Sequence, residues 1–306
     1  MNPILSEILE IPTRAADVLQ SATEPLPLQV PYLGMGSSYF APLAFKYMGL
    51  PIYPELASDY FYYLAKGAKK PLAVLLSQSG RSSEVLWCRA LFDQYVAVSN
   101  DTGSALCTAS NVSQVVPIRA GAEQYSSSKT YVNTLIALFK GFGLSPAASV
   151  ERITKSMNRY REQGEQLADA VFSVLTQHRI HGMYITGSGP NIATACEAAL
   201  ILSESTKLNF HGLPMAQYDH GPKETARNSI VIQILAKGPA YERTRRLSEL
   251  IAGSGGHVLM IEEPDVDENQ SILPNIIPFN FMAYYLALKL NIGETFVVGG
   301  KVTEAI

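Results

Sequence analysis

Short runs of apolar and β-branched residues alternate with longer helical patterns along the whole chain. The strand-like runs lie at 28–33, 71–80, 94–100, 113–120, 183–186, 229–236 and 257–262. Apolar positions with helical spacing lie at 82–92, 127–143, 150–177, 190–206 and 280–290. This alternation is typical of βαβ units on a parallel sheet whose faces are covered by helices.

The two halves of the chain begin in the same way, with a strand, a turn of the form G-x-G-polar, and a helix. The turns are Gly34–Ser38 in the first half and Gly187–Asn191 in the second. Between the halves, the stretch 144–149 reads LSPAAS and ends the preceding helical pattern. We therefore predict two α/β domains of one design, residues 1–148 and residues 149–306.

Composition supports a globular protein with two cores. Apolar residues make up 47 % of the 306 positions and charged residues 17 %, which suffices for two domains of ordinary size. The formal net charge is -3, and the sequence has no run of Lys or Arg of the kind that follows a phosphate backbone. We therefore expect no nucleic-acid partner.

The sequence lacks the usual signals for export, for a membrane and for metal binding. Glu7, Glu10 and Pro12 interrupt the region where a signal peptide needs an unbroken apolar stretch. The longest late apolar run, 281–288, is too short to cross a bilayer. The three cysteines are far apart without a CxxC pair, so neither disulfides nor a zinc site is expected. We predict a soluble, cytoplasmic protein that needs no metal and no organic cofactor.

Polar turns follow two predicted strands of the first half. Ser37 and Ser38 end the first turn, and Ser77-Gln78-Ser79-Gly80 with Ser82 forms the second. Ligands of open α/β sheets bind beyond the carboxyl ends of strands, and a phosphate monoester suits a neutral cluster of hydroxyl, amide and N–H donors. Ser and Gly are also ordinary turn and cap residues, a reading that fits the short first turn better than the second. The first turn is not a full GxGxxG, which disfavours a dinucleotide.

Taken in order, several segments resemble the sugar isomerase (SIS) domain family. They are Gly36-Ser37-Ser38-Tyr39, Ser77-Gln78-Ser79-Gly80, Ala120-Gly121-Ala122-Glu123, Ser127-Ser128-Lys129, Glu197-Ala198-Ala199-Leu200, Glu204, His220-Gly221-Pro222 and Lys301-Val302-Thr303. The chain looks most similar to the isomerase half of glutamine–fructose-6-phosphate aminotransferase (glucosamine-6-phosphate synthase) and to related glucosamine-6-phosphate deaminases. The resemblance covers nearly the whole chain. It implies two flavodoxin-like, three-layer αβα domains with parallel sheets, in a homodimer with a shared active site.

The resemblance also implies roles for individual residues. The residues implied to hold the phosphate are Ser77, Gln78, Ser79 and Ser82, and those implied to touch the sugar are Ser37, Ser38 and Ser126. Glu204 would move a proton between C1 and C2, because aldose–ketose chemistry needs one carboxylate over adjacent carbons. His220, supplied by the neighbouring subunit in the family, would assist ring opening. Lys301 would form a Schiff base with the ketose. Without the resemblance, Glu204 could equally be a structural carboxylate, His220 a loop histidine and Lys301 a solvated lysine.

The chain departs from the family pattern where nitrogen chemistry is concerned. It begins at the isomerase region, and Asn2 rather than a cysteine directly follows Met1, so we expect no glutaminase domain. Ile201 stands where the aminotransferases carry lysine, and the segment between Glu123 and Lys129 is one residue short. The proline–arginine element usual before the final lysine is missing. These changes keep the sugar-phosphate site and put the nitrogen chemistry in question.

Three functions remain open. The first is an enzyme of glucosamine-6-phosphate and fructose-6-phosphate, a deaminase or an ammonia-dependent aminotransferase. The second is an isomerase of the phosphoglucose or phosphomannose type, which the SSKTY and KVT segments make less favoured. The third is a non-catalytic sensor of a hexose-6-phosphate or hexosamine-6-phosphate. The presence of Glu204, His220 and Lys301 weighs against the sensor.

Overall fold

The computed structural model describes residues 2–303, which divide into two compact units. The N-terminal unit is Glu10–Val150 together with the tail from Val297 onward, and the C-terminal unit is Glu151–Phe296 together with the residues up to Leu9. The chain ends are thus exchanged between the units. The predicted boundary between 148 and 149 lies close to the change of unit at Val150, but the sequence does not predict the exchange of the chain ends. The division into domains 1–148 and 149–306 stays a prediction. Positions 1 and 304–306 of the two predicted domains lie outside the described residues.

The N-terminal unit holds a five-stranded parallel sheet with the strand order β2-β1-β3-β4-β5. The strands are β1 Pro31–Gly34, β2 Tyr53–Leu56, β3 Lys70–Leu76, β4 Phe92–Ser99 and β5 Val112–Pro117. This is the flavodoxin-like order, in which the sheet grows first to one side of β1 and then to the other. Ligands of such sheets bind where the order reverses, so the loops after β1 and β3 occupy the expected place.

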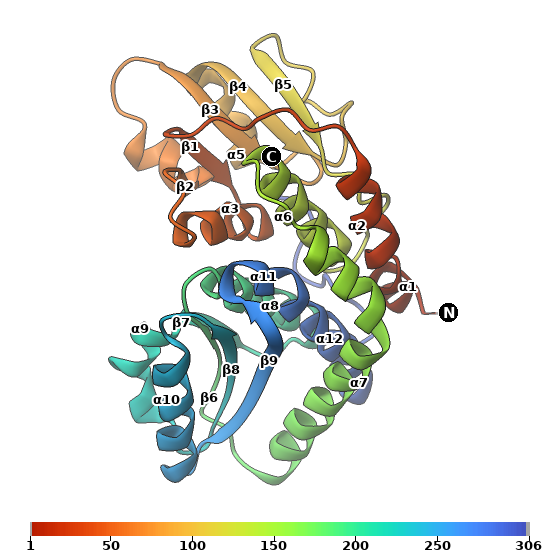
Figure 1. Ribbon diagram of the computed structural model, residues 1–306, viewed down its shortest axis with the longest axis vertical. Coiled ribbons are helices and arrows are strands. Elements are labelled where there is room, and N and C mark those ends of the chain that lie inside the picture. The colour runs from red at the N-terminus through yellow and green to blue at the C-terminus, as the bar shows by residue number, and fades with distance from the viewer. Residues whose placement is uncertain (1, 304–306) are drawn as a thin grey trace. The chain divides into compact units, whose positions relative to one another are not determined.

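Helices cover both faces of this sheet (Figure 1). They are α2 Ile11–Gln20, α3 Ser37–Tyr47, α4 Ala57–Asp59, the π-helix Tyr60–Leu64, α5 Ser83–Cys88, the 3-10 helix Arg89–Leu91 and α6 Lys129–Gly141. Tyr32 packs on Phe142, at the end of α6, with ring centroids 5.7 Å apart. Leu33, the next residue, joins the cluster under α5 and the π-helix. Consecutive strand residues point to opposite faces, so these two sets of helices lie on opposite sides.

The C-terminal unit repeats the first four positions of this order, as β7-β6-β8-β9, again with parallel strands. The strands are β6 Gly182–Gly187, β7 Phe210–Pro214, β8 Ser229–Lys237 and β9 His257–Asp267. The helices are α1 Pro3–Leu9, α7 Ala147–Gln177, α8 Asn191–Thr206, α9 Met215–Asp219, the 3-10 helix Pro222–Thr225, α10 Tyr241–Gly253, α11 Glu268–Asn275 and α12 Ile277–Lys289. α9 and α10 cover one face, and α8, α11 and α12 cover the other (Figure 1). The prediction of two parallel α/β sheets with helices on both faces is confirmed.

Each strand-like run in the sequence corresponds to a strand, with shifts at the ends. The helix predicted at 82–92 is too long, because α5 ends at Cys88 and Phe92 already belongs to β4. The sequence does not predict β2 or β7. Both are short edge strands, and their sequences, YPEL and FHGLP, contain proline or glycine where a central strand has an apolar run.

One helical stretch of the described chain, Glu268–Lys289, is long and apolar enough to cross a membrane by length and composition alone. It comprises α11 and α12, and it extends beyond the apolar run at 281–288. However, 89 % of its most apolar window is buried inside the protein. Such burial is what a core helix of a globular domain shows, so the stretch belongs to the core of the C-terminal unit.

Candidate functional site

The serine-rich turn lies directly beyond the carboxyl end of β3. Ser77 and Ser79 are 2 % and 8 % exposed. Their hydroxyls accept hydrogen bonds from Gly80 N at 3.1 Å and from Arg81 N at 3.2 Å. Ser77 Oγ and Ser82 Oγ share a hydrogen bond of 3.1 Å. The structure therefore gathers these hydroxyls in one place, while their contact with a phosphate stays a prediction.

The shape of this turn depends on Gly80. Its φ is +62°, in the left-handed region that a residue with a Cβ rarely adopts. A Cβ on Gly80 would overlap the side chain of Ser104, and Leu106 N donates to the Gly80 carbonyl at 3.2 Å. The carbonyl of Gln78 accepts from Asn100 N at 3.0 Å. The loop after β4 thus packs closely on the turn and fixes its conformation.

The first polar turn lies beside the serine turn. β1 and β3 are neighbours in register, with Leu33 opposite Leu75, so their carboxyl ends meet at one edge of the sheet. Ser37 and Ser38 form the first residues of α3, directly after β1. Both predicted groups of serines therefore lie at the point where the strand order reverses, as a ligand site in this fold requires.

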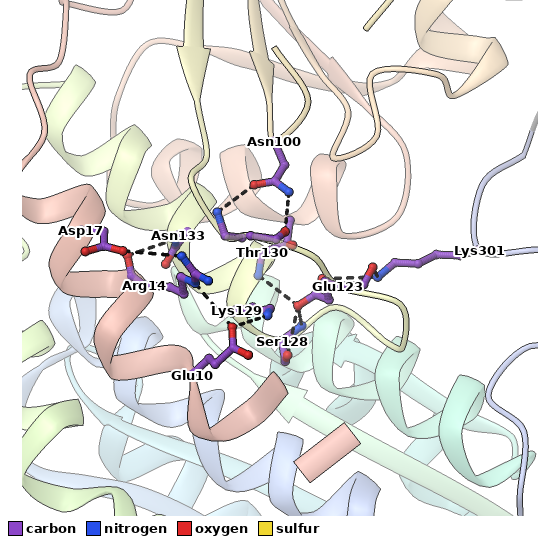
Figure 2. A network of polar contacts seen from close by, with 12 residues as sticks. Glu10, Arg14, Asp17, Asn100, Glu123, Ser128, Lys129, Thr130, Asn133 and Lys301 are labelled. Carbon is purple, nitrogen blue, oxygen red and sulfur yellow. Dashed lines mark hydrogen bonds and ion pairs between the residues drawn. The ribbon is translucent and has the colours of Figure 1, made fainter. Parts of the chain in front are cut away.

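The loop between β5 and α6 is organised around the buried carboxylate of Glu123 (Figure 2). Glu123 Oε1 accepts hydrogen bonds from Ser128 N at 3.0 Å, Ser128 Oγ at 3.0 Å and Thr130 N at 3.2 Å. A helix start leaves such N–H groups without partners inside the helix, and a carboxylate satisfies them. Ser126, predicted to touch the sugar, is half-buried in this loop. Glu123 therefore fixes the backbone on either side of Ser126.

Two further contacts hold the same loop in place. Asn100 Nδ2 donates to Gly121 O at 2.7 Å, and Asn100 Oδ1 accepts from Ala120 N at 2.7 Å. Lys129 is 1 % exposed and donates to Glu10 Oε2 at 2.7 Å (Figure 2). This hydrogen bond lowers the pKa of the Glu10 carboxyl. Lys129, the lysine of the SSK segment, thus forms a structural ion pair with Glu10, the residue that precedes α2.

A polar cavity of about 810 Å³ adjoins this loop at the ends of β4 and β5. Its charged lining residues are Arg14, Asp17, Asp101 and Arg119. The cavity carries charges of both signs, whereas the serine turn gathers the hydroxyls of Ser77, Ser79 and Ser82 and contains Arg81 but no carboxylate. We therefore place the candidate phosphate site at the serine turn and not in this cavity.

Lys301 joins the tail to the Glu123 loop (Figure 2). Its Nζ donates to Glu123 O at 3.0 Å, to the carbonyl of Tyr125, and to Glu123 Oε2 at 3.4 Å. Two residues later, Thr303 O accepts from Ser83 N at 3.0 Å and from Ser83 Oγ at 3.2 Å. The tail is thus tied to two loops of the N-terminal unit, one of them next to Ser82. Sequence reasoning singles out Lys301 but not its partners.

Replacing Lys301 by methionine is expected to release the tail, because the hydrogen bonds from Nζ to two oxygens of Glu123 and to the carbonyl of Tyr125 are lost. The amide of Ser83 reports on this directly, since its hydrogen bond to Thr303 O protects it from exchange. Hydrogen–deuterium exchange of the Ser83 amide should become several-fold faster in Lys301→Met. Lys66→Met, which alters an exposed lysine outside the tail, should leave that exchange unchanged. Equal protection of Ser83 in both variants would show that Lys301 does not hold the tail.

Glu204 and His220 belong to the C-terminal unit. Glu204 is half-buried in the last turn of α8, and His220 is exposed at the end of α9. Lys207 ends α8 with a left-handed φ of 60°, and its Nζ donates to the carbonyl oxygens of Glu204 and Thr295. The serine turns and Lys301 lie in the N-terminal unit. The predicted site residues therefore form two groups, one in each unit.

The C-terminal sheet reverses its strand order between β6 and β8, and a carboxylate lies against the loops that follow these two strands. A Cβ on Gly238 would overlap the carboxylate of Glu268, and one on Gly189 would lie 3.1 Å from it. Burial, followed by the nearby charge of Asp267, raises the pKa of Glu268. A phosphate would meet this carboxylate and be repelled by it. Of the two points where the strand order reverses, the one in the N-terminal unit is therefore the better candidate for a phosphate.

The fold matches solved structures over nearly its whole length. The C-terminal domain of glucosamine-fructose-6-phosphate aminotransferase from Francisella tularensis has a TM-score of 0.79 at 17 % identity, covering 96 % of this chain and 98 % of that one. Glucosamine-6-phosphate deaminase from Thermotoga maritima has a TM-score of 0.76 at 16 % identity, covering 93 % and 94 %. At these identities the likeness establishes the fold.

In sequence, the chain is 25 % identical over 325 residues to the glutamine–fructose-6-phosphate aminotransferase (isomerizing) of Methanothermobacter thermautotrophicus, covering 94 % of this chain and 54 % of that protein. These relatives and structural neighbours support the resemblance to the sugar isomerase (SIS) domain family. No family model matches the chain. The chain is related to part of the aminotransferases, and this relation supports an enzymatic role. It spans about half the length of the curated relatives it matches.

Proposed function

We propose that the chain is an enzyme of glucosamine-6-phosphate and fructose-6-phosphate, acting as a deaminase or as an ammonia-dependent aminotransferase. The observation that carries this proposal is the serine turn after β3, where the hydroxyls of Ser77, Ser79 and Ser82 gather at the reversal point of the sheet. The names of its relatives support the choice of sugars, since they refer to glucosamine-6-phosphate and to fructose-6-phosphate.

The two serine-rich turns are proposed to recognise the sugar phosphate. The residues proposed to hold the phosphate are Ser77, Gln78, Ser79 and Ser82, and those proposed to touch the sugar are Ser37, Ser38 and Ser126. A phosphate monoester presents three strong acceptor oxygens, which suit hydroxyl and N–H donors. The burial of Ser77 and Ser79 supports the assignment, because water competes less for donors in such a place.

The proton transfer is assigned to residues of the C-terminal unit. Glu204 takes the carbon-bound proton from one of C1 and C2 and returns it to the other, as one carboxylate positioned over both carbons can. His220 transfers a proton during ring opening, for which a group titrating near neutrality is suited. His220 is exposed, which supports its action in the site of a partner subunit.

The nitrogen step follows from that proton transfer. In deamination, the C2 proton of the open-chain aldose moves to C1 and leaves an imine at C2. Water adds to that imine, the C–N bond breaks, and one ammonia and fructose-6-phosphate are released. Amination is the reverse, with ammonia adding at C2 and one water leaving. If Lys301 forms a Schiff base with the ketose, it must first lose its proton and its contacts with Glu123 and Tyr125.

A plain phosphosugar isomerase is the second candidate. Position 201, where the resemblance implies lysine in the aminotransferases, holds an isoleucine that is 1 % exposed. This side chain offers no polar group for nitrogen chemistry. The proton transfer by Glu204 does not depend on position 201, so it would interconvert an aldose and a ketose without ammonia.

We also propose that the chain works as a cytoplasmic homodimer with a shared active site. Two observations support this: His220 is exposed, and 89 % of the most apolar window of Glu268–Lys289 is buried inside the protein. The proposal makes the second subunit part of each site, so activity should fall when the dimer is diluted into monomers.

Incubation of the purified chain with glucosamine-6-phosphate should release ammonia and fructose-6-phosphate in equal amounts. Glucosamine without its phosphate serves as the matched control and should be inert, because the serine turn would have nothing to bind. Interconversion of glucose-6-phosphate and fructose-6-phosphate without ammonia would establish the plain isomerase instead. Binding of these sugar phosphates without any turnover would overturn the enzyme and leave a sensor.

A further inference from the structure

A small cavity of the N-terminal unit is lined by three lysines, and we call it the lysine cavity. It has a volume of about 250 Å³ and adjoins the loop between the π-helix and β3, which contains Lys66, Lys69 and Lys70. The other described residues that line it carry no charge. The lysine cavity is therefore positive, unlike the larger cavity at the ends of β4 and β5, which carries charges of both signs.

The three lysines have no acidic partner within the protein. Within residues 2–303, none of them forms an ion pair with a carboxylate. All three side chains are exposed, so they can turn toward a bound molecule. Three cations around one cavity repel one another, and an anion placed between them would relieve this repulsion.

Tyr60 brings a hydroxyl without a partner to the same cavity. Its side chain lines the cavity but is only 3 % exposed, and its ring stacks on Phe92 with centroids 5.8 Å apart. Among the described residues, its buried hydroxyl has no hydrogen-bond partner, which is uncommon for a buried polar group. Lys70 Nζ lies 5.1 Å from the centroid of the Tyr60 ring. A ligand with several acceptor oxygens could therefore satisfy a cation and a hydroxyl that are already neighbours.

The backbone of the loop adds further donors. Gly67 has a φ of +91°, in the region that favours glycine, and both Gly67 and Ala68 line the cavity. Within residues 2–303, neither Gly67 N nor Ala68 N donates to a backbone carbonyl. Successive free N–H groups in a turn are a common feature of anion sites. The lysine cavity therefore combines cations, N–H donors and a hydroxyl.

We propose that the lysine cavity binds a compact diphosphate group, either free or at the end of a larger metabolite. Phosphate oxygens are strong acceptors, and lysine binds phosphate as a point charge. One phosphate monoester has a charge of about −1.5 to −2 at neutral pH, which is less than three lysines can balance. The volume of about 250 Å³ lies below the range of about 300–1,000 Å³ that is usual for pockets of drug-sized ligands. Charge and size together therefore favour a diphosphate over a single phosphate or a large ligand.

The lysine cavity is separate from the serine turn. Lys70 is the first residue of β3, and Ser77 directly follows the last one. At the usual rise of a strand, the two residues are roughly 20 Å apart. The inference is thus independent of the proposed reaction, which the ammonia assay measures at the other end of this strand.

Titration calorimetry of the full chain with inorganic pyrophosphate at low salt should show one site per chain, because salt would screen the exposed lysines. Saturating fructose-6-phosphate should leave this affinity unchanged. The double variant Lys66→Met/Lys69→Met should raise the dissociation constant of pyrophosphate at least roughly tenfold, since contacts between lysine and phosphate are charge-assisted. Lys46→Met/Lys237→Met, which removes the same charge at exposed lysines outside the cavity, is the matched control and should bind as wild type does.

Tyr60→Phe tests the hydroxyl apart from the cations. Without ligand, this variant should unfold no more easily than wild type, because the hydroxyl that it loses has no partner in the protein. Its affinity for pyrophosphate should nevertheless fall several-fold. Titration with ADP distinguishes the two sources of a diphosphate: binding that is as tight as that of pyrophosphate, and equally sensitive to Lys66→Met/Lys69→Met, indicates the end group of a larger metabolite. Binding of pyrophosphate alone indicates the free ion.

Four results would overturn the inference. The first is no detectable binding of pyrophosphate, and the second is competition by fructose-6-phosphate, which would place pyrophosphate at the serine turn. The third is an equal loss of affinity in Lys46→Met/Lys237→Met, because net charge alone would then explain the binding. The fourth is an affinity that neither Tyr60→Phe nor Lys66→Met/Lys69→Met reduces.

Discussion

Replacing Glu204 by glutamine is expected to slow the proton transfer between C1 and C2 by about 10²–10⁴-fold, the usual contribution of a general base. The amide keeps the shape of the side chain but has no basic oxygen that can take a proton from carbon. The fold should tolerate the change, because Glu204 is half-buried and its backbone carbonyl stays held by Lys207. Affinity for the sugar phosphate should change little, since the proposed phosphate donors lie elsewhere.

Deuterium incorporation into fructose-6-phosphate in D₂O, followed by NMR, measures this step without any nitrogen chemistry. Glu249→Gln, an exposed carboxylate on α10 of the same unit, is the matched control and should exchange at the wild-type rate. Isothermal titration with fructose-6-phosphate separates binding from catalysis in each variant. A Glu204→Gln variant that still exchanges the carbon-bound proton within a few-fold of wild type would mean that another group is the base.

The central strands can be predicted from the sequence because both of their faces are buried. β8, SIVIQILAK, is buried at Ser229 through Leu235, so its apolar run needs no alternation to be recognised as a strand. The edge strands β2 and β7 give no such run, because their sequences, YPEL and FHGLP, contain proline or glycine. The edge strands β5 and β9 could therefore be predicted with the central strands, whereas β2 and β7 could not.

The candidate site is predictable only where its residues are close in sequence. Ser77, Ser79 and Ser82 lie within one turn, so the gathering of their hydroxyls follows from the local pattern. Thr303 and Ser83 are 220 positions apart, and no sequence pattern predicts their hydrogen bond. Glu123 had a weak signal, since its AGAE segment belongs to the family resemblance without an implied role. The exchange of the chain ends between the units is non-local in the same way.

Replacing Gly80 by alanine is expected to weaken binding of fructose-6-phosphate at least roughly tenfold, the loss that follows from about 1.4 kcal/mol of binding free energy. Left-handed backbone costs a residue with a Cβ about 1–2 kcal/mol of folding free energy. At Gly80 the new methyl also overlaps the side chain of Ser104, whose loop packs on the serine turn through Leu106 N and Gly80 O. The turn must move to accommodate it, so the hydroxyls of Ser77 and Ser82 lose their common geometry.

Gly143→Ala separates the clash from the backbone cost. Gly143 has a similar φ of +71°, and a Cβ there would meet nothing within 4 Å. This control should therefore lower the free energy of unfolding by the backbone cost alone and bind fructose-6-phosphate normally. The double variant Gly80→Ala/Ser104→Gly removes the overlapping side chain and should recover part of the lost affinity. Titration calorimetry with each variant decides the matter: if Gly80→Ala binds the sugar phosphate as tightly as Gly143→Ala, the serine turn is not the phosphate site.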